Sequence, residues 1–336
     1  MESGRVQIER FESTVLKGNP LGDPFVRRIP VYLPPSYDSS PERRYPVVFL
    51  LSGFTGRGLM MLNDQPWSMA IDERMDRLIA SGRAGEMILV MPDCFTRFGG
   101  SQYLDSPATG RYETHVVEEL VPWMDRTFRT MASREHRGVA GKSSGGYGAL
   151  VLGMKHPGVF GAVACQSGDL YFEYCYRADL PKACSVLQEA GGVRAFLERF
   201  ESQPQKGKDG FVALEILGMA ACYSADPNEE LGVALPFDLG SGAFRPEIWK
   251  RWLEHDPLHM LEAHADALRS LRLLYLDCGT RDEFHLHHGL RLFVRELVAR
   301  DIRHVSEEFA DGHMNVTYRY DITLPLLSQA LGAARA

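Results

Sequence analysis

The stretch HRGVAGKSSGGYGAL, residues 136–150, decides the fold of this 336-residue chain. The short apolar run 139–140 predicts the end of a buried strand, and Gly-Lys-Ser-Ser-Gly at 141–145 follows it as a Gly-x-Ser-x-Gly pattern. Apolar residues then recur at helical spacing until His-Pro-Gly at 156–158 ends the helix. Strand, sharp turn and helix are the setting of a nucleophile elbow, so we predict that Ser143 stands exposed at the top of a sheet.

Two other glycine motifs do not fit this stretch. A phosphate-binding loop, Gly-x-x-x-x-Gly-Lys-Ser, would need glycine at His136. A dinucleotide-binding Gly-x-Gly-x-x-Gly beginning at Gly146 would need glycine at Val151. A glycine-rich turn without chemistry stays open at this point, until the chain supplies a base, an orienting acid and oxyanion donors.

The composition indicates a globular protein with a sizeable core, because 45% of the residues are hydrophobic and 24% are charged. A net charge of -7 gives no sign of a nucleic-acid or anionic-membrane partner. The N-terminus has no apolar signal segment, and the most apolar piece, 46–54, is only strand-sized. The six scattered cysteines are expected to be buried free thiols in a reducing compartment. We therefore expect a cytoplasmic protein without metal or cofactor, and leave a homodimer open.

Along the chain, strands and helices alternate, which predicts a mainly parallel sheet covered on both faces. An N-terminal antiparallel pair is expected at 6–17 and 25–33. Further strands are expected at 46–51, 87–91, up to 140, 161–165, 271–276 and 304–309. Helices are expected at 72–80, 113–128 with a kink or late start at Pro122, after the elbow, 286–299 and 322–331.

The alternation is interrupted over about a hundred residues, which hold helical patches at 192–200 and 246–254 and loops at 203–210 and 226–230. We interpret residues 169–268 as a cap or lid inserted into a core formed by 1–168 and 269–336. A surface insertion without a role in the site is the alternative.

A serine nucleophile needs a base and an orienting carboxylate, which in an α/β-hydrolase follow it in the order Ser, Asp or Glu, His. The loop after the strand at 271–276 carries Asp282, with Asp277 and Glu283 as alternatives, and the loop after the last strand carries His313. Both loops fall where the order predicts. We therefore predict Asp282 as the orienting acid and His313 as the base of an α/β-hydrolase.

The oxyanion donors should be two backbone N–H groups, one from the residue after the nucleophile and one from the loop after an early strand. Ser144 and Phe54 occupy these positions, and Gly53 lets the loop turn back over the site. His285, His287 and His288 share no helical face well, so we expect a solvent-facing helix start there and no metal site.

These motifs together resemble the putative esterase family of α/β-hydrolases, which includes S-formylglutathione hydrolases, enterochelin esterases, feruloyl esterases and antigen 85-type mycolyltransferases. The resemblance covers residues 25–168 and 270–325. It implies Ser143, Asp282 and His313 as the triad. Lys142 stands where S-formylglutathione hydrolases usually have histidine, and Ser144 replaces their methionine.

The activity this implies is a serine carboxylesterase acting on small or aromatic esters through an acyl-enzyme. A thioesterase or an acyltransferase on the same triad is the alternative, and a peptidase or a non-catalytic binding protein of this fold is less favoured. The long loop 92–111 should line the pocket. We expect Trp67, Tyr103 and Lys142 to bind substrate, and further candidate walls are Phe54, Phe95, Tyr171, Phe172 and Trp252.

Overall fold

A computed structural model describes residues 3–333 and contains a central sheet of eight strands in the order β1-β2-β4-β3-β7-β8-β9-β10. The first three strands in this order are antiparallel neighbours, and the remaining pairs are parallel. The strands are β1 (Arg5–Glu12), β2 (Val26–Leu33), β3 (Val47–Leu51), β4 (Ile88–Val90), β7 (Arg137–Lys142), β8 (Ala162–Gln166), β9 (Leu273–Gly279) and β10 (Val305–Phe309). The predicted α/β-hydrolase sheet, mainly parallel, is confirmed.

Strand β3 is apolar throughout because both faces of the sheet are covered. Val47, Phe49 and Leu51 point into one hydrophobic core, while Val48 and Leu50 point into the other. This alternation follows from the two-residue period of a strand. The central strands are therefore held from both sides.

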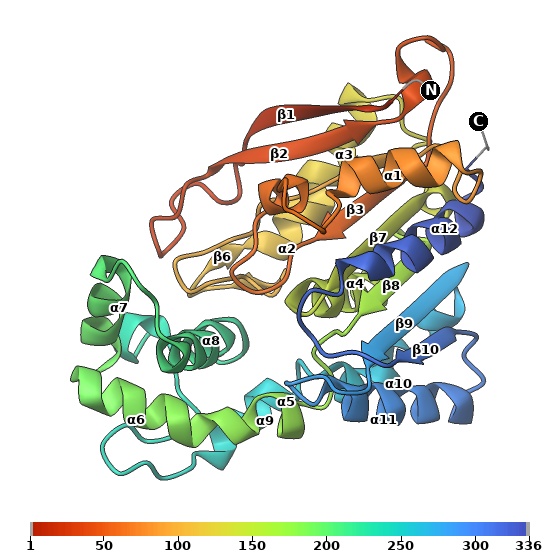
Figure 1. Cartoon of the computed structure of the whole chain (residues 1–336). Coiled ribbons are helices and arrows are strands. Elements are labelled where there is room, and N and C mark those ends of the chain that lie inside the picture. The colour runs from red at the N-terminus through yellow and green to blue at the C-terminus, as the bar shows by residue number, and fades with distance from the viewer. Residues whose placement is uncertain (1–2, 334–336) are drawn as a thin grey trace.

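Helices cover both faces of the sheet, as predicted (Figure 1). On one face lie α1 (Ile71–Ala80) and α12 (Tyr320–Ala330). On the other lie α2 (Tyr112–Thr114), α3 (Val121–Thr127), α4 (Ser144–Lys155), α10 (Pro257–Arg269) and α11 (Leu286–Ala299).

The single helix expected over 113–128 is divided into three parts. A π-helical segment, His115–Leu120, lies between α2 and α3, and Pro122 occupies the first turn of α3. Proline has no N–H to donate and its ring crowds the preceding turn, and the wider π turn before Pro122 accommodates it. The helix is thus irregular at Pro122, where a kink or a late start was expected.

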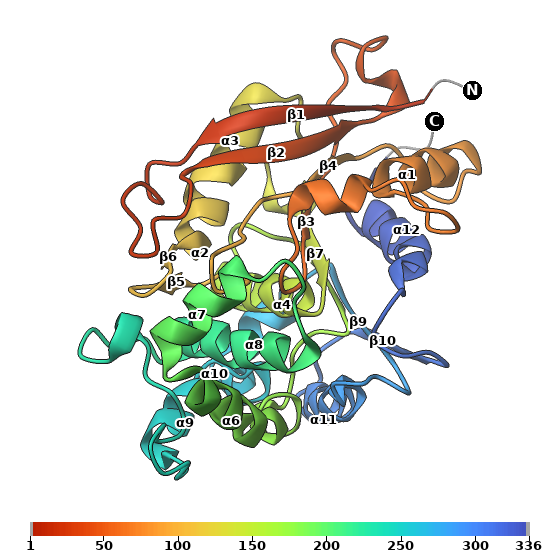
Figure 2. The ribbon, with the colours of Figure 1, turned by 60° about the vertical axis from the view of Figure 1, so that its left-hand side comes forward.

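The segment between β8 and α10 forms a group of helices beside the sheet, in the region predicted to be a cap and called the cap below (Figure 2). Its helices are α5 (Phe172–Cys175), α6 (Leu180–Ala190), α7 (Val193–Ser202), α8 (Lys208–Tyr223) and α9 (Pro246–Leu253). The helical patches predicted at 192–200 and 246–254 correspond to α7 and α9, whereas no helix was predicted at α6 or α8. Helix α8 is buried almost all round from Ala213 to Tyr223, so it lacks the one-sided apolar stripe that reveals a surface helix.

Several boundaries differ from those predicted. Strand β1 ends at Glu12 rather than at residue 17, and α8 begins inside the loop expected at 203–210. The loop 92–111 contains a small hairpin, β5 (Asp105–Ser106) with β6 (Gly110–Arg111). Helix α10 packs on α4, so the C-terminal part of the region 169–268 covers the sheet. The limits 169–268 proposed for the cap stay a prediction.

All six cysteines are free and buried, as expected. In the part of the chain that the structure describes, no helix combines the length and apolar character needed to cross a membrane.

Replacing Phe49 by alanine tests how much the packing of β3 contributes to the stability of the protein. Its ring is fully buried and meets the edge of Phe160 at 5.9 Å between centroids, so Phe49→Ala should lower the free energy of unfolding by about 3–5 kcal/mol. Urea unfolding followed by circular dichroism measures this change. Val298→Ala, at a side chain 65% exposed, should change the free energy by less than about 0.5 kcal/mol. Equal effects of the two changes would contradict this view of the core.

Candidate active site

The nucleophile elbow is built by close approach of backbone to backbone. Ser143 joins β7 to α4 at φ 59° and ψ -130°, a strained conformation for a residue with a side chain. A Cβ on Gly145 would lie 2.1 Å from the Leu51 carbonyl oxygen, and one on Gly141 would lie 2.4 Å from the Gly145 carbonyl carbon. Only glycine fits at these two positions, which is the physical reason for the Gly-x-Ser-x-Gly pattern.

The structure brings the three predicted triad side chains into one hydrogen-bonded chain. His313 Nε2 lies 3.0 Å from Ser143 Oγ, and His313 Nδ1 lies 2.7 Å from Asp282 Oδ2. His313 is 3% exposed and Asp282 is 2% exposed, so solvent competes weakly for these bonds. The ring of Phe284 meets the His313 ring edge-on at 4.8 Å. This is the geometry in which a histidine can take a proton from a serine.

The charge on Asp282 is stabilised by its partners. Burial raises the pKa of this carboxyl, but the hydrogen bond and charge of His313 and the N–H groups of Phe284 and Leu286 outweigh burial, and the pKa is lowered overall. An ionised Asp282 can therefore orient the imidazole and stabilise its protonated form.

Asp277, the alternative acid, is engaged elsewhere. It accepts a hydrogen bond from Arg319 Nε at 2.9 Å and from the Tyr275 hydroxyl at 3.0 Å. Burial dominates its electrostatics and raises the pKa to about 6, although Arg319 opposes the shift. Asp277 thus anchors the chain before α12, and its carboxylate has no contact with His313.

The predicted oxyanion loop lies directly against the elbow. A Cβ on Gly53 would lie 3.3 Å from Ser143 Cβ and 3.2 Å from the Lys142 carbonyl oxygen, so a side chain here would crowd the elbow. Thr55, at φ 61°, donates its N–H to the Gly99 carbonyl at 2.7 Å, which holds the loop from outside. Within residues 3–333, the N–H groups of Phe54 and Ser144 have no acceptor, so both are free to donate to a ligand.

The three residues predicted to bind substrate differ in burial and in their contacts. Lys142 is half-buried beside the site; burial lowers the pKa of its ammonium group, and the nearby Asp282 and Asp169 oppose the shift. Tyr103 is buried and donates its hydroxyl to the Ser52 carbonyl at 2.6 Å, so it supports the oxyanion loop from below rather than facing a ligand. Trp67 is fully exposed (104%), and its role in substrate binding stays a prediction.

Two of the other aromatic wall candidates belong to the interior of the cap. Phe172 and Trp252 are completely buried, and both pack against Tyr176. Apolar aromatic residues in an inserted segment are more often core than pocket, and a sequence does not separate the two.

The histidines at the start of α11 correct another expectation. His285 is exposed, but His287 is buried with its Nδ1 unpaired among the described residues. The helix start is therefore only partly solvent-facing, because the turn of α11 that carries Leu286 and His287 faces inward.

The structure places two further carboxylates at the site. Asp169 had no predicted role, and Glu283 was predicted only as an alternative to Asp282. Glu283 Oε2 accepts a hydrogen bond from the backbone N–H of His313 at 2.6 Å and so links the loop of Asp282 to the loop of His313. Asp169, which follows β8, accepts hydrogen bonds from Ser144 Oγ at 3.3 Å and from the Tyr176 hydroxyl at 2.7 Å. Asp169 had a signal, since it follows the carboxyl end of a strand, but its partners lie far away in the sequence.

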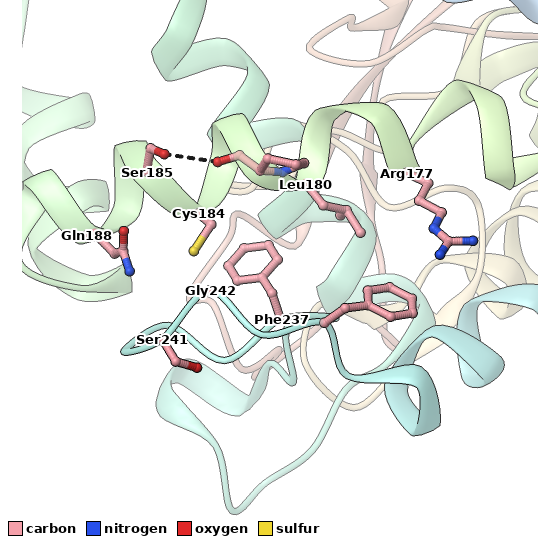
Figure 3. A pocket seen from close by; sticks show the side chains of 10 residues that line it. Arg177, Leu180, Cys184, Ser185, Gln188, Phe237, Ser241 and Gly242 are labelled. Atoms are coloured by element: carbon pink, nitrogen blue, oxygen red, sulfur yellow. Dashed lines mark hydrogen bonds between the residues drawn. The ribbon is translucent and has the colours of Figure 1, made fainter.

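Other concave and polar features lie away from the triad. A cavity of about 400 Å³ in the cap is lined by α6 and the 237–244 loop (Figure 3). Among the described residues, one group has metal-ligand spacing, Glu173, Asp256 and His259. Asp256 is already used there as the N-cap of α10, accepting the Leu258 N–H at 2.9 Å.

Exchanging each loop carboxylate for its amide separates their roles. Asp282→Asn should reduce kcat on an ester substrate by about 10³–10⁴-fold, because an amide cannot stabilise the imidazolium or hold the same tautomer. Asp277→Asn should leave kcat within a few-fold and act on thermal stability through its lost ion pair with Arg319. Steady-state kinetics and thermal unfolding of both variants measure the two effects, and the reverse ranking in kcat would move the orienting role to Asp277.

A protein family and several known proteins are similar to this chain. It matches the family described as "Putative esterase" over residues 26–320. It is 32% identical over 169 residues to an esterase of Mycobacterium tuberculosis, a match that covers 49% of this chain and 32% of that protein. It is 30% identical over 149 residues to an endo-1,4-beta-xylanase/feruloyl esterase of Xylanibacter ruminicola, covering 42% of this chain and 19% of that protein. The chain thus spans a third or less of the length of these relatives.

Solved structures share the fold. A ferulic acid esterase from Anaeromyces mucronatus aligns with a TM-score of 0.60 at 17% identity, covering 99% of this chain and 93% of that one. An S-formylglutathione hydrolase from Agrobacterium tumefaciens aligns with a TM-score of 0.60 at 19% identity, covering 99% and 97%. With the family match over residues 26–320, these findings show that the chain belongs to the putative esterase family of α/β-hydrolases.

Proposed function

We propose that this protein is a serine carboxylesterase that hydrolyses small or aromatic carboxylic esters through an acyl-enzyme on Ser143. The observation that carries the proposal is the hydrogen-bonded chain from Ser143 through His313 to Asp282, set beside two unoccupied backbone N–H donors. Membership of the esterase family supports the reaction class. The feruloyl esterase relative supports aromatic acyl groups among the substrates to be tested.

Acylation begins with proton transfer from Ser143 Oγ to His313 Nε2 as the oxygen attacks the ester carbonyl carbon. The contact of 3.0 Å between these two atoms lets the transfer occur without rearrangement. The carbonyl oxygen becomes negatively charged, and the Phe54 and Ser144 N–H groups donate to it. His313 then protonates the leaving alcohol, and Asp282 stabilises the imidazolium in between.

Deacylation repeats the chemistry with water as the nucleophile. His313 takes a proton from water, the same two N–H groups hold the second oxyanion, and Ser143 regains its proton as the acid leaves. The strained backbone of Ser143 keeps Oγ in place for both steps, so little reorganisation is needed at either.

Covalent labelling tests this proposal. A fluorophosphonate probe should form an adduct on Ser143 that peptide mapping locates, and the wild-type protein should turn over p-nitrophenyl esters. Ser143→Ala should lose the adduct and at least about 10³-fold in kcat while keeping its thermal unfolding temperature. Turnover on a panel of rising acyl length, run beside the corresponding thioesters, measures the acyl preference.

The control is Ser185→Ala, a change at a hydroxyl that hydrogen-bonds within α6 of the cap. This variant should keep both the adduct and the turnover. An unlabelled but folded wild-type protein would overturn the proposal and favour a binding protein on a hydrolase scaffold. Preferred turnover of thioesters would redirect it to a thioesterase.

A further inference from the structure

The side chain of Phe54 is enclosed by three glycines from two different segments. A Cβ on Gly99 would lie 2.4 Å from the ring, and one on Gly100 would lie 3.4 Å from it. The third glycine, Gly218, belongs to cap helix α8, where a Cβ would lie 3.2 Å from Phe54 Cε2 and 2.5 Å from the Phe98 carbonyl oxygen. Helix α8 therefore packs its backbone directly onto the residue that carries one oxyanion donor.

The second oxyanion residue is reached by the same helix through hydrogen bonds. Ser144 Oγ donates to Asp169 Oδ2, which also accepts from Gln102 Nε2 at 3.1 Å. Gln102 Nε2 lies 2.9 Å from the hydroxyl of Tyr223, the last residue of α8. The Tyr176 hydroxyl completes the network on Asp169. Every member is buried, so these bonds act in a low-dielectric setting without competition from water.

Three residues in the segments that carry the network have left-handed backbone conformations. Gln102 and Tyr103 adopt φ values of 49° and 56°, and Ser167, two residues before Asp169, adopts 41°. Left-handed conformations of residues with side chains persist only where the surroundings over-determine them. These conformations lie in the two segments that connect α8 to the elbow, 101–103 and 167–169, where the hydrogen bonds of the network also lie.

We propose that α8 positions the oxyanion hole, with Gly218 acting on the Phe54 N–H and the Tyr223–Gln102–Asp169 network acting on the Ser144 N–H. This inference rests on the proposed esterase function. Gly218, Tyr223, Gln102 and Asp169 are positioning residues. The cap is then part of the catalytic geometry as well as a cover, because a single helix contacts Phe54 and is linked to Ser144 through hydrogen bonds.

The consequence for catalysis is specific to the transition state. The N–H donors must meet the oxygen where it develops its charge, and misplacement by about 1 Å costs about 10²-fold in rate. Ground-state binding of the ester depends less on these donors, so displacement of α8 should lower kcat and leave KM nearly unchanged.

Gly218→Ala is the decisive variant, because its Cβ cannot fit at 2.5 Å from the Phe98 carbonyl oxygen without movement of α8 or of the Phe54 loop. A Cβ this close to backbone lowers the unfolding temperature whatever the role of α8, so a merely structural role predicts lower stability with kcat of the folded protein unchanged. Positioning predicts a fall in kcat of about 10–100-fold, with a parallel fall in the fluorophosphonate labelling rate and KM within about two-fold. Amide hydrogen exchange should rise in residues 52–58.

The matched control is Gly207→Ala, at the N-cap of the same helix, where a Cβ would meet nothing within 4 Å. It should keep kcat, labelling rate and exchange at wild-type values. Tyr223→Phe is the second test; it removes one hydroxyl from the network without changing the packing and should lower kcat by about three- to ten-fold at unchanged KM.

The outcomes separate this inference from the proposed function. Wild-type kcat and unchanged exchange at 52–58 in a folded Gly218→Ala protein would overturn it. If Gly218→Ala does not fold, Tyr223→Phe with wild-type kcat would overturn it instead. A wild-type protein without esterase activity would end the proposed function, while raised exchange at 52–58 in Gly218→Ala alone would still support control of the loop by α8.

Discussion

The close contact between β3 and the nucleophile elbow is the constraint on which the rest of the site depends. Strands β3 and β7 are parallel neighbours, with Leu51 opposite Gly141. The Leu51 carbonyl oxygen leaves no room for a side chain on Gly145. The loop that follows β3 consequently emerges beside Ser143. One backbone contact thus sets the strained nucleophile and places a predicted oxyanion donor next to it.

Parallel pairing extends this arrangement across the sheet. Strands β7, β8, β9 and β10 are consecutive neighbours, and the chain segments after their carboxyl ends supply Ser143, Asp169, Asp282 and His313 in that order. Because parallel strands end at a common edge, residues 170 positions apart reach hydrogen-bond distance. Glu283 adds a link between the last two loops, which explains how an acid loop and a base loop on separate strands keep a contact of 2.7 Å.

The cap adds a second layer of constraint from outside the sheet. Its helix α8 contacts Phe54 through a glycine and ends at Tyr223, which joins the buried polar network around Asp169. Every residue of this network is buried and makes at least one hydrogen bond, although Gln102 Oε1 has no partner among the described residues. The cap and the sheet are in this way joined at the point where charge develops in the proposed reaction.

The sequence by itself determined the alternation of strands and helices, the Gly-x-Ser-x-Gly elbow and the order of Ser143, Asp282 and His313, because each is a local pattern of apolar period, glycine spacing or strand-end position. The local pattern favoured Asp282 over Asp277 as the orienting acid but did not exclude Asp277. The tertiary structure decided that Asp277 is held by Arg319, that Tyr103 supports Ser52, and that Trp67 lies in solvent. It also decided the roles of Gly218 and Asp169, since their partners are brought together by packing between segments distant in the chain. Long-range contact leaves no period in a sequence, and α8, which is buried on nearly every side from Ala213 to Tyr223, shows this most directly.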